Sequence, residues 1–324
     1  MSTPELLALS SRLSIGAAQV FRNLTVLPLI DATAPPTGWL TLDQAIGRGV
    51  ADISEISEHG SVPQLRLRNR AGEKLFLLDG EELVGAKQNR ILNLSILAPA
   101  GSGLEIPVSC VEQGRWSWRS RQFQGTERVI YSKLRRSNSE AVSCSLDRDG
   151  SSRGDQGRVW DDISMKSARM AVHSDTSAAS ALYEHYGRDV DEFVGKVEVL
   201  PGQVGAAFLV NGRFAGLDLL GGPDLVPGLL PKLVRSYALD ALEDSDVEDG
   251  RGGAPRDPAL AGAGAGAEAA VRTALEGAGR LSPSRTRAVG EGDDVRLRGP
   301  GLVGAALIAG GGVAHLSLWS ADYR

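Results

Sequence analysis

Two segments far apart in the chain share one pattern, and each predicts a β-hairpin. In residues 204–217, two apolar runs flank Asn211-Gly212, the favoured pair for a two-residue turn because both positions tolerate positive φ. Residues 303–316 repeat the Val-Gly-Ala-Ala of the first segment and have glycines at the turn. We interpret the two as a repeated hairpin that provides two equivalent edges of one sheet system. Coincidence among Gly/Ala/Val-rich strands is the alternative.

Short apolar or alternating runs separated by turn residues predict further strands in the first half of the chain. Pro28 indicates an edge or a bend in the first of them. Thr41 and Gln44 have capping-box spacing, which predicts a helix over residues 41–49. The predicted strands are 24–30, 53–56, 64–68, 75–78, 90–98 and 104–111, with turns that include His59-Gly60 and 99–103.

The middle of the chain changes character. Residues 120–157 are rich in Ser, Arg and Asp and poor in apolar residues, which is typical of a mobile flap or a solvated excursion. Apolar periodicity predicts helices over 159–172, 178–194 and 225–242. Residues 243–266 have too little apolar mass to order themselves, and 267–278 predict a surface helix.

These patterns predict an α+β fold with a mostly antiparallel β core from both chain halves and flanking helices from the middle. We expect residues 1–242 to form an α+β domain. Residues 243–279 are interpreted as a low-complexity insertion, and residues 280–324 as a C-terminal hairpin that completes the same domain.

Composition excludes several classes of protein. The 324 residues carry a formal net charge of −5, which argues against a general nucleic-acid binder. The two cysteines form no disulfide framework, and no apolar run is long enough to span a bilayer. The first residues lack the pattern of a signal peptide, so we expect a cytoplasmic protein without a membrane segment.

Asp79-Gly80-Glu81-Glu82 predicts a tight turn that presents two adjacent carboxylates after a buried strand. Such a pair can bind a metal, or one member can act as a base whose pKa the other raises. Glu81 and Glu82 are therefore candidate catalytic residues. A solvated turn is the structural alternative.

The next connection holds two cations and two amides, Lys87-Gln88-Asn89-Arg90, in one short row. This inventory suits an oxyanion such as phosphate, or a set of sugar hydroxyls. The Gly85-Ala86 entry would let backbone N–H groups approach the ligand. We assign all four side chains to ligand binding, with a charge-guarded edge strand as the alternative.

A second polar turn, 110–116, follows the strand over 104–111. Glu112 is a third catalytic candidate, and Arg115 and Trp116 are candidate ligand contacts. Trp116 and Trp118 could stack a base or a sugar, with core packing as the alternative. Cys110 is interpreted as a small buried thiol. No histidine stands in a metal-ligating spacing, and no metal or cofactor is assigned.

The run LDGEELVGAKQNRILNLSILAPAGSGLEIPVSCVEQGRW, followed by QGRVWDDI, resembles the ARPP-1 domain family, named for its association with ADP-ribosylglycohydrolase and rhodanese-phosphatase superfamilies. The resemblance covers residues 14–242 and the last hairpin. It implies a setting in ADP-ribose- or nucleotide-linked metabolism, or in prokaryotic conflict systems. It supplies no catalytic residues.

The leading hypothesis is a domain that binds or processes a phosphate- or ribose-bearing small molecule. It requires the two polar turns to converge. The alternative is a non-enzymatic interaction module whose protein partner contacts residues 120–157. Metal-dependent hydrolysis by the carboxylates is a third possibility.

Overall fold

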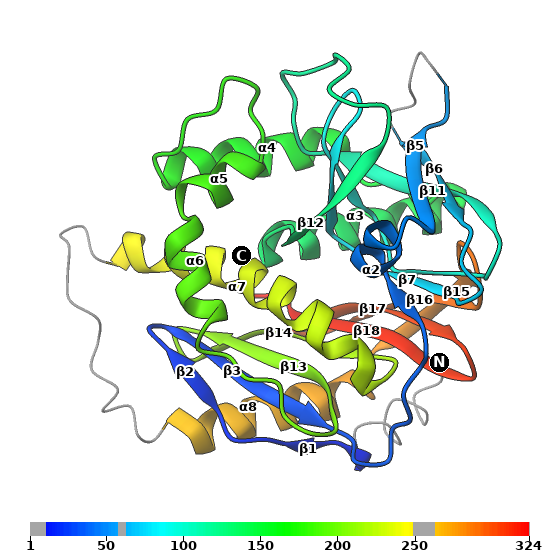
Figure 1. Cartoon of the computed structure of the whole chain (residues 1–324). Coiled ribbons are helices and arrows are strands. Elements are labelled where there is room, and N and C mark those ends of the chain that lie inside the picture. The colour runs from blue at the N-terminus through cyan, green and yellow to red at the C-terminus, as the bar shows by residue number, and fades with distance from the viewer. Residues whose placement is uncertain (1–10, 58–62, 249–262, 324) are drawn as a thin grey trace. The chain divides into compact units, whose positions relative to one another are not determined.

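The computed structural model describes residues 11–57, 63–248 and 263–323 (Figure 1). The described residues form two compact units, each assembled from distant segments. Unit 1 draws on Met1–Thr37, Arg188–Arg285 and Asp294–Arg324, and unit 2 on Gly38–Gly187 and Thr286–Asp293. Mostly antiparallel sheets with separate helices confirm the α+β prediction. The domain boundaries at 242 and 279 stay a prediction.

Unit 1 is built on a nine-stranded sheet in the order β1-β3-β13-β14-β18-β17-β16-β15, with β2 also paired to β3. Its strands are β1 (Ser14–Ile15), β2 (Gln19–Phe21), β3 (Leu24–Ile30), β13 (Gln203–Val210), β14 (Arg213–Leu220), β15 (Ser282–Arg287), β16 (Asp293–Gly299), β17 (Leu302–Ala309) and β18 (Gly312–Ser320). The sheet therefore joins strands from both ends of the chain.

Both predicted hairpins are present in this sheet. Asn211 and Gly212 have φ of 51° and 74°, as a two-residue turn of this type requires. The second hairpin turns at two glycines that also have positive φ. The expectation that the hairpins form edges is wrong, because β14 pairs with β18 and the hairpins are neighbours inside the sheet (Figure 1). The sequence pattern of a hairpin predicts how its own two strands pair, but not which other strands lie beside them in the sheet.

The two hairpins also share their irregularities. Each ladder shifts register at the same point of the repeat, between Phe208 and Leu209 in one and between Leu307 and Ile308 in the other. Where the hairpins meet, Asp218 of β14 lies opposite Ser317 of β18, its own counterpart in the repeat. The hairpins are thus related by an approximate twofold axis through this pair.

β3 is not an edge strand, so of the two expectations from Pro28, an edge or a bend, the edge is wrong. It pairs with β13 on one side and with β1 and β2 on the other. Pro28 lies opposite the break between these two short strands, where the backbone N–H of Gly16 donates to the Pro28 carbonyl. A proline fits inside the sheet here because the ladder on that side is interrupted.

Helices cover both faces of the unit 1 sheet. α7 (Val226–Glu248), preceded by η1 (Pro223–Leu225), lies on one face, where Tyr237 stacks on Phe208 with centroids 4.0 Å apart. α8 (Ala263–Ala278) packs on the opposite face and buries Val271 and Leu275 in the apolar cluster. The expected surface helix is therefore a core element. Residues 249–262 of the predicted low-complexity segment lie outside the described residues.

Unit 2 contains a six-stranded sheet in the order β12-β8-β9-β11-β6-β5 and a three-stranded sheet, β10-β7-β4. An antiparallel bridge joins Ser54 of β5 to Gln122, just before β12, so the two edges of the larger sheet meet. We call it the closed sheet. Its strands are β5 (Ala51–Glu55), β6 (Gln64–Asn69), β8 (Glu81–Gly85), β9 (Arg90–Leu92), β11 (Gly103–Cys110) and β12 (Phe123–Val129); the smaller sheet has β4 (Leu40–Thr41), β7 (Leu75–Leu77) and β10 (Ile96–Ala98).

Alternation along the strands fills the closed sheet with apolar side chains. Leu65 and Leu67 of β6 are fully buried between exposed or half-buried neighbours, as the strict alternation predicts. They belong to one apolar cluster with Ile53, Leu83, Leu92, Ile106, Val108 and Phe123. The predicted strand over 90–98 is wrong in one respect, because it breaks after β9 and resumes as β10 in the smaller sheet.

The helices of unit 2 are α2 (Leu42–Gly47), α3 (Ser132–Asp149), α4 (Gln156–Arg169) and α5 (Ser180–His185). Thr41 and Gln44 form the predicted capping box of α2. The predicted helix over 178–194 is two helices, α5 and α6 (Gly187–Val194). The predicted turn at His59-Gly60 lies outside the described residues.

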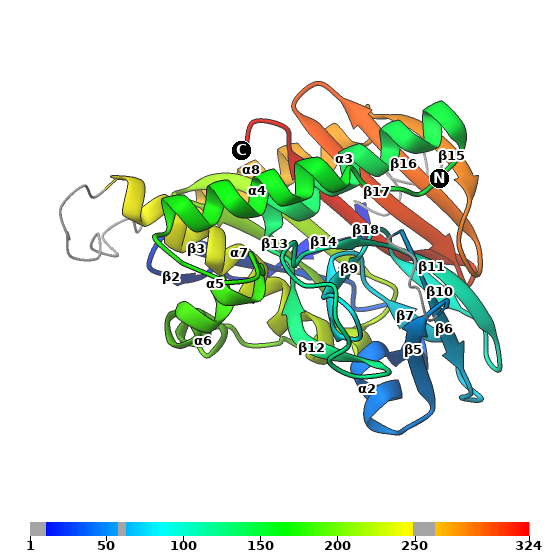
Figure 2. The ribbon, with the colours of Figure 1, turned by 90° about the horizontal axis from the view of Figure 1, so that it is seen from above.

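The prediction of a flap over residues 120–157 is wrong. This segment forms β12 and α3, and α3 packs beside α4 (Figure 2). The helix was missed because its inward face is polar. Arg135 forms an ion pair with Asp79 with the closest atoms 2.8 Å apart, Asn138 Nδ2 donates to Asn93 Oδ1 at 3.1 Å, and Ser137 Oγ donates to Asp162 at 2.9 Å.

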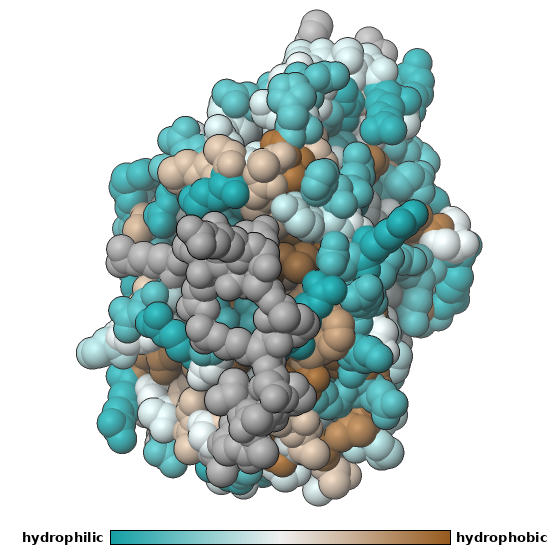
Figure 3. Space-filling view, turned by 90° about the vertical axis from the view of Figure 1, so that its left-hand side faces the viewer, coloured by the Kyte–Doolittle hydropathy of each residue, from teal (hydrophilic) through white to brown (hydrophobic). Residues whose placement is uncertain are grey.

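None of the helices in the described part of the chain is both long and apolar enough to cross a membrane. On the face shown in Figure 3, apolar residues lie in small groups among polar ones. Large apolar side chains that are more than two-fifths exposed are few among the described residues: Val20, Trp116, Trp118, Met165 and Val199.

Candidate functional site

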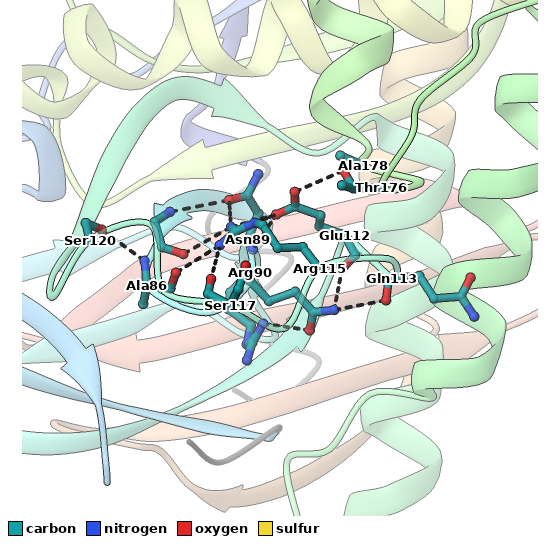
Figure 4. A network of polar contacts seen from close by, with 12 residues as sticks. Ala86, Asn89, Arg90, Glu112, Gln113, Arg115, Ser117, Ser120, Thr176 and Ala178 are labelled. Carbon is teal, nitrogen blue, oxygen red and sulfur yellow. Dashed lines mark hydrogen bonds and ion pairs between the residues drawn. The ribbon is translucent and has the colours of Figure 1, made fainter. Parts of the chain in front are cut away.

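The two polar turns converge, and Arg115 lies where they meet (Figure 4). Its guanidinium donates to Glu112 Oε2 from Nε at 2.9 Å and to Asn89 Oδ1 from Nη2 at 3.0 Å. It also donates to the backbone carbonyls of Gly85, Ala86 and Ser117. Arg115 thus ties the 85–90 connection to the turn after β11, and its donors are directed at protein atoms.

Glu112 is buried and its carboxylate is fully engaged. One oxygen accepts from Arg115 and from the backbone N–H of Asn89, and the other accepts from Thr176 Oγ1 at 3.0 Å. Burial alone would raise the pKa of Glu112, but the hydrogen bonds from Arg115 and Asn89 outweigh it and leave the pKa below its usual range. A carboxylate held in this way is suited to positioning the loop.

Gln88 links this pair to Arg90. Its amide nitrogen donates to the backbone carbonyl of Glu112, and its oxygen accepts from Arg90 Nη1 at 3.0 Å. The structure therefore brings together Gln88, Asn89, Arg90, Glu112 and Arg115, as the hypothesis of convergence requires. What the sequence did not predict is that most of their polar atoms satisfy one another.

The entry to the connection is also engaged internally. The backbone N–H of Ala86, a residue with φ of 40°, donates to Ser120 Oγ at 3.0 Å. The N–H of Gly85 donates to Asn89 Oδ1 at 3.3 Å. The expectation that these two N–H groups approach a ligand is therefore wrong, because short side chains close the turn around them.

A third segment, residues 174–179, completes the network and was missed from the sequence. Thr176 accepts a hydrogen bond from the N–H of Gly114 through its carbonyl oxygen and donates to Glu112 through its hydroxyl. A Cβ on Gly114 would lie 2.9 Å from Thr176 Cα, so only glycine permits this approach. The segment carries no motif that would have indicated its role.

Glu81 and Glu82 do not form the expected pair on a turn. Both lie in β8, where successive side chains point to opposite faces of the sheet. Glu81 accepts a hydrogen bond from the N–H of Leu78 at 2.8 Å. Glu82 points the other way, and its Oε2 lies 3.0 Å from Arg128 Nε. Asp79, at the turn itself, forms the ion pair with Arg135.

Glu82 is a buried carboxyl with charged neighbours. Burial raises the pKa of Glu82, the Arg128 guanidinium opposes the rise, and the negative charges of Glu184 and Glu112 add to it. Of the three catalytic candidates it is the one whose environment suits acid–base chemistry. The catalytic assignment of Glu81, Glu82 and Glu112 stays a prediction.

We expect replacement of Glu82 by glutamine to change how stability depends on pH. A carboxyl whose folded pKa is raised stabilises the fold fully below its unfolded value of 4.5 and loses that contribution as pH rises through the folded pKa. Glu82→Gln has no such loss, so its unfolding midpoint should rise relative to the native protein between about pH 4.5 and neutrality. Urea unfolding across this range measures it. Glu105→Gln, an exposed position in β11, is the control, and parallel pH profiles for native protein and Glu82→Gln would contradict the prediction.

Trp116 and Trp118 form the exposed part of the site, and the buried Lys87 lies against them. The Lys87 ammonium lies 5.5 Å from the ring centroid of Trp116 and 5.2 Å from that of Trp118. Trp116 and Trp118 are each 48% exposed as residues, whereas Lys87 is 8% exposed. The rings are therefore not core residues, and a cation is held against them.

Cys110 is a buried thiol, as predicted. Burial raises its pKa to about 11, and the nearby Arg90 charge only partly opposes the rise. Gln156 binds its backbone through two hydrogen bonds of 2.8 Å. The thiolate is therefore scarce at neutral pH, which argues against a nucleophilic role. Among the described residues, no group of three or more His, Cys, Asp or Glu side chains is arranged to hold a metal ion.

Comparison with known families gives one match. A family model described as "ARG and Rhodanese-Phosphatase-superfamily-associated Protein domain", ARPP-1, matches residues 12–319. Comparisons with curated proteins and with solved structures gave no match. The family match spans both units.

Proposed function

Because the chain belongs to the ARPP-1 domain family, we propose that unit 2 binds a phosphate- or ribose-bearing small molecule at Lys87, Trp116 and Trp118. The family description associates the domain with ARG and rhodanese-phosphatase superfamilies, which favours a ligand related to ADP-ribose or nucleotides. One observation carries the proposal: a nearly buried ammonium lies against two half-exposed indole rings.

The chemistry of these three side chains suits both parts of such a ligand. Indole faces stack on bases and on the apolar faces of sugars. The Lys87 ammonium is a compact point charge with three donors, suited to a phosphate. The backbone that presents Lys87 is fixed by Arg115 together with Glu112 and Asn89. Arg115 donates hydrogen bonds to the backbone carbonyls of Gly85 and Ala86 and to the side-chain oxygen of Asn89.

Isothermal titration calorimetry with AMP, ribose 5-phosphate and inorganic phosphate tests the proposal. Trp116→Ala and Trp118→Ala should each weaken AMP binding by about 1–3 kcal/mol, the usual contribution of one base stacked on an aromatic side chain. They should change phosphate binding much less, because the anion contacts Lys87.

Met165→Ala removes another exposed apolar side chain, on α4, and serves as the matched control. Native protein that binds none of the three compounds would refute the proposal. So would tryptophan variants that bind AMP as tightly as the native protein does.

The alternative function is a non-enzymatic interaction module whose partner contacts residues 120–157. This segment is not a mobile flap, because residues 132–149 form helix α3, and its Arg135 and Asn138 are engaged within unit 2. No specific observation among the described residues favours a protein partner.

A further inference from the structure

The apolar filling of the closed sheet stops at one end, where polar side chains take its place. Alternation along β5 directs Glu55 to the same side as Ile53, into the closed sheet. Arg90 of β9 lies opposite Cys110 of β11 in the ladder, and the charges of Glu55 and Arg90 both act on the Cys110 thiol. Glu55, Arg90 and Cys110 therefore form one layer, which we call the polar layer.

Four buried polar atoms of this layer have no hydrogen-bond partner among the described residues. They are Nε and Nη2 of Arg90 and both carboxylate oxygens of Glu55. Arg90 is 0% exposed and the Glu55 side chain 2% exposed, and the closest approach between them, Nη2 to Oε1, is 3.7 Å. Arg90 and Glu55 thus form an ion pair without a hydrogen bond. Buried polar groups are almost always hydrogen-bonded, so four atoms without a partner around one ion pair suggest a place for a further polar group.

The neighbouring hydrogen-bond network does not satisfy these atoms. Arg90 donates to Gln88 through Nη1, and its Nε and Nη2 make no hydrogen bond to the described residues. Burial lowers the pKa of Arg90, whereas the charges of Cys110 and Glu55 raise it. The guanidinium stays protonated at neutral pH in proteins, so the layer keeps a donor-only group beside an acceptor-only group.

We propose that the polar layer recognises a neutral ligand group that presents two adjacent O–H or N–H donors. This inference rests on the proposed function and specifies which part of the ligand the polar layer would bind. Glu55 can accept from both donors at once, as carboxylates do with ribose hydroxyls. Two sources have this chemistry: the vicinal diol of a ribose, and the N1 and N2 edge of a guanine.

The opposite charges of Arg90 and Glu55 disfavour charged ligand groups in the polar layer. A ligand cation would meet the Arg90 guanidinium, and a phosphate would meet the Glu55 carboxylate, 3.7 Å from Arg90. Like-charge contacts of this kind are unfavourable in a buried setting. In this proposal the anion contacts Lys87 rather than Arg90, and the assignment of Arg90 to ligand binding stays a prediction.

Trp116 connects the polar layer to the exposed part of the site. The Arg90 guanidinium carbon lies 5.6 Å from the centroid of the Trp116 ring, and the same ring contacts the Lys87 ammonium. A ligand stacked on Trp116 would have one part near Lys87 and another near Arg90. The two ends differ in chemistry, which would orient a nucleotide in one direction.

Calorimetric titration with AMP, 2′,3′-dideoxy-AMP, GMP and inorganic phosphate tests the inference in the native full-length chain and in Glu55→Gln. If the diol is read, native protein should bind AMP roughly tenfold to a hundredfold more tightly than the dideoxy compound. If the polar layer binds the guanine edge, native protein should bind GMP more tightly than AMP by a similar factor. Glu55→Gln keeps the shape but replaces one acceptor by a donor, so it should abolish whichever preference is found and leave phosphate affinity unchanged.

Glu105→Gln makes the same chemical change at an exposed position of the closed sheet and should change no affinity. Phosphate binding shows that each variant is folded, and the preferences of native protein decide the question even if Glu55→Gln is unstable. Nucleotide binding without either preference, or a preference that survives Glu55→Gln, overturns this inference and leaves the proposed function standing. Phosphate binding without any nucleotide binding likewise overturns the inference alone. Absence of all binding overturns both.

Discussion

Replacement of Arg115 by alanine is expected to lower the free energy of unfolding of unit 2 by about 3–5 kcal/mol, the usual cost of removing one partner of a buried ion pair. The side chains of Arg115 and Glu112 are 12% and 6% exposed, with Arg115 Nη2 2.7 Å from Glu112 Oε2. The substitution would leave Glu112 buried with an uncompensated charge and would release three backbone carbonyls. Urea unfolding followed by tryptophan fluorescence measures the loss.

The control for this prediction is Arg119→Ala, an exposed arginine in the same loop. It should change the urea midpoint little, because exposed charges contribute little to stability. A second expectation follows from the lowered pKa of Glu112. Its contribution to stability is present above its unfolded pKa of 4.5 and is lost as pH falls through the lower folded value. An Arg115→Ala protein as stable as Arg119→Ala at neutral pH would contradict the structural role assigned to Arg115.

Replacement of Gly205 or Gly304 by alanine is expected to destabilise unit 1 by about 1–3 kcal/mol each, the range for forcing extra atoms into a packed core. A Cβ on Gly205 would lie 2.1 Å from the Asp218 carbonyl oxygen, and a Cβ on Gly304 would lie 2.4 Å from that of Ser317. Both obstacles are backbone atoms of the paired strand, which cannot rotate away. The two glycines hold the same place in the repeated Val-Gly-Ala-Ala, so similar losses are expected. Thermal unfolding of both variants measures them.

Gly312→Ala is the matched control, because a Cβ there has open space and the residue lies in the second hairpin. It should be nearly neutral or slightly stabilising, since alanine restricts the unfolded chain more than glycine does. Losses at Gly205 and Gly304 no larger than the effect at Gly312 would contradict the close strand packing described for the hairpins.

Local sequence signals identified much of the fold because the structure that they predict is itself local. The Asn211-Gly212 turn and the Thr41–Gln44 capping box each depend on a few neighbouring residues. Strict alternation in residues 64–68 likewise predicted which side chains are buried. The order of strands within each sheet was not predicted, because it depends on pairings between distant segments.

Helix α3 was missed because sequence periodicity detects apolar faces. Its buried side chains in contact with the rest of unit 2 include Arg135 and Asn138, whose partners Asp79 and Asn93 lie far away in sequence. Nothing in a single sequence distinguishes a polar helix face with buried partners from one in water.

Polar density singled out the two polar turns, and the structure brings them into contact. That they form a ligand pocket stays a prediction. The sequence could not show which polar residues bind one another. Arg115 and Glu112 were assigned to a ligand or to catalysis, yet they chiefly satisfy protein atoms. Glu55 was not noticed, because one acid at the end of a predicted strand resembles an ordinary solvated residue. Only its burial and its missing partners single it out.

The discontinuous composition of the two units has a consequence for how the chain acquires its structure during synthesis. β3 leaves the ribosome long before its partner β13, and all strands of the closed sheet emerge between them. Since domains generally fold as they emerge, unit 2 can assemble while the apolar β3 still lacks its neighbour. Unit 2 in turn receives its last piece late, when Glu291 reaches Lys74 and Gly290 pairs with Leu97. No single cut in the chain yields two complete halves, so fragments must be joined from several segments before either unit can be studied alone.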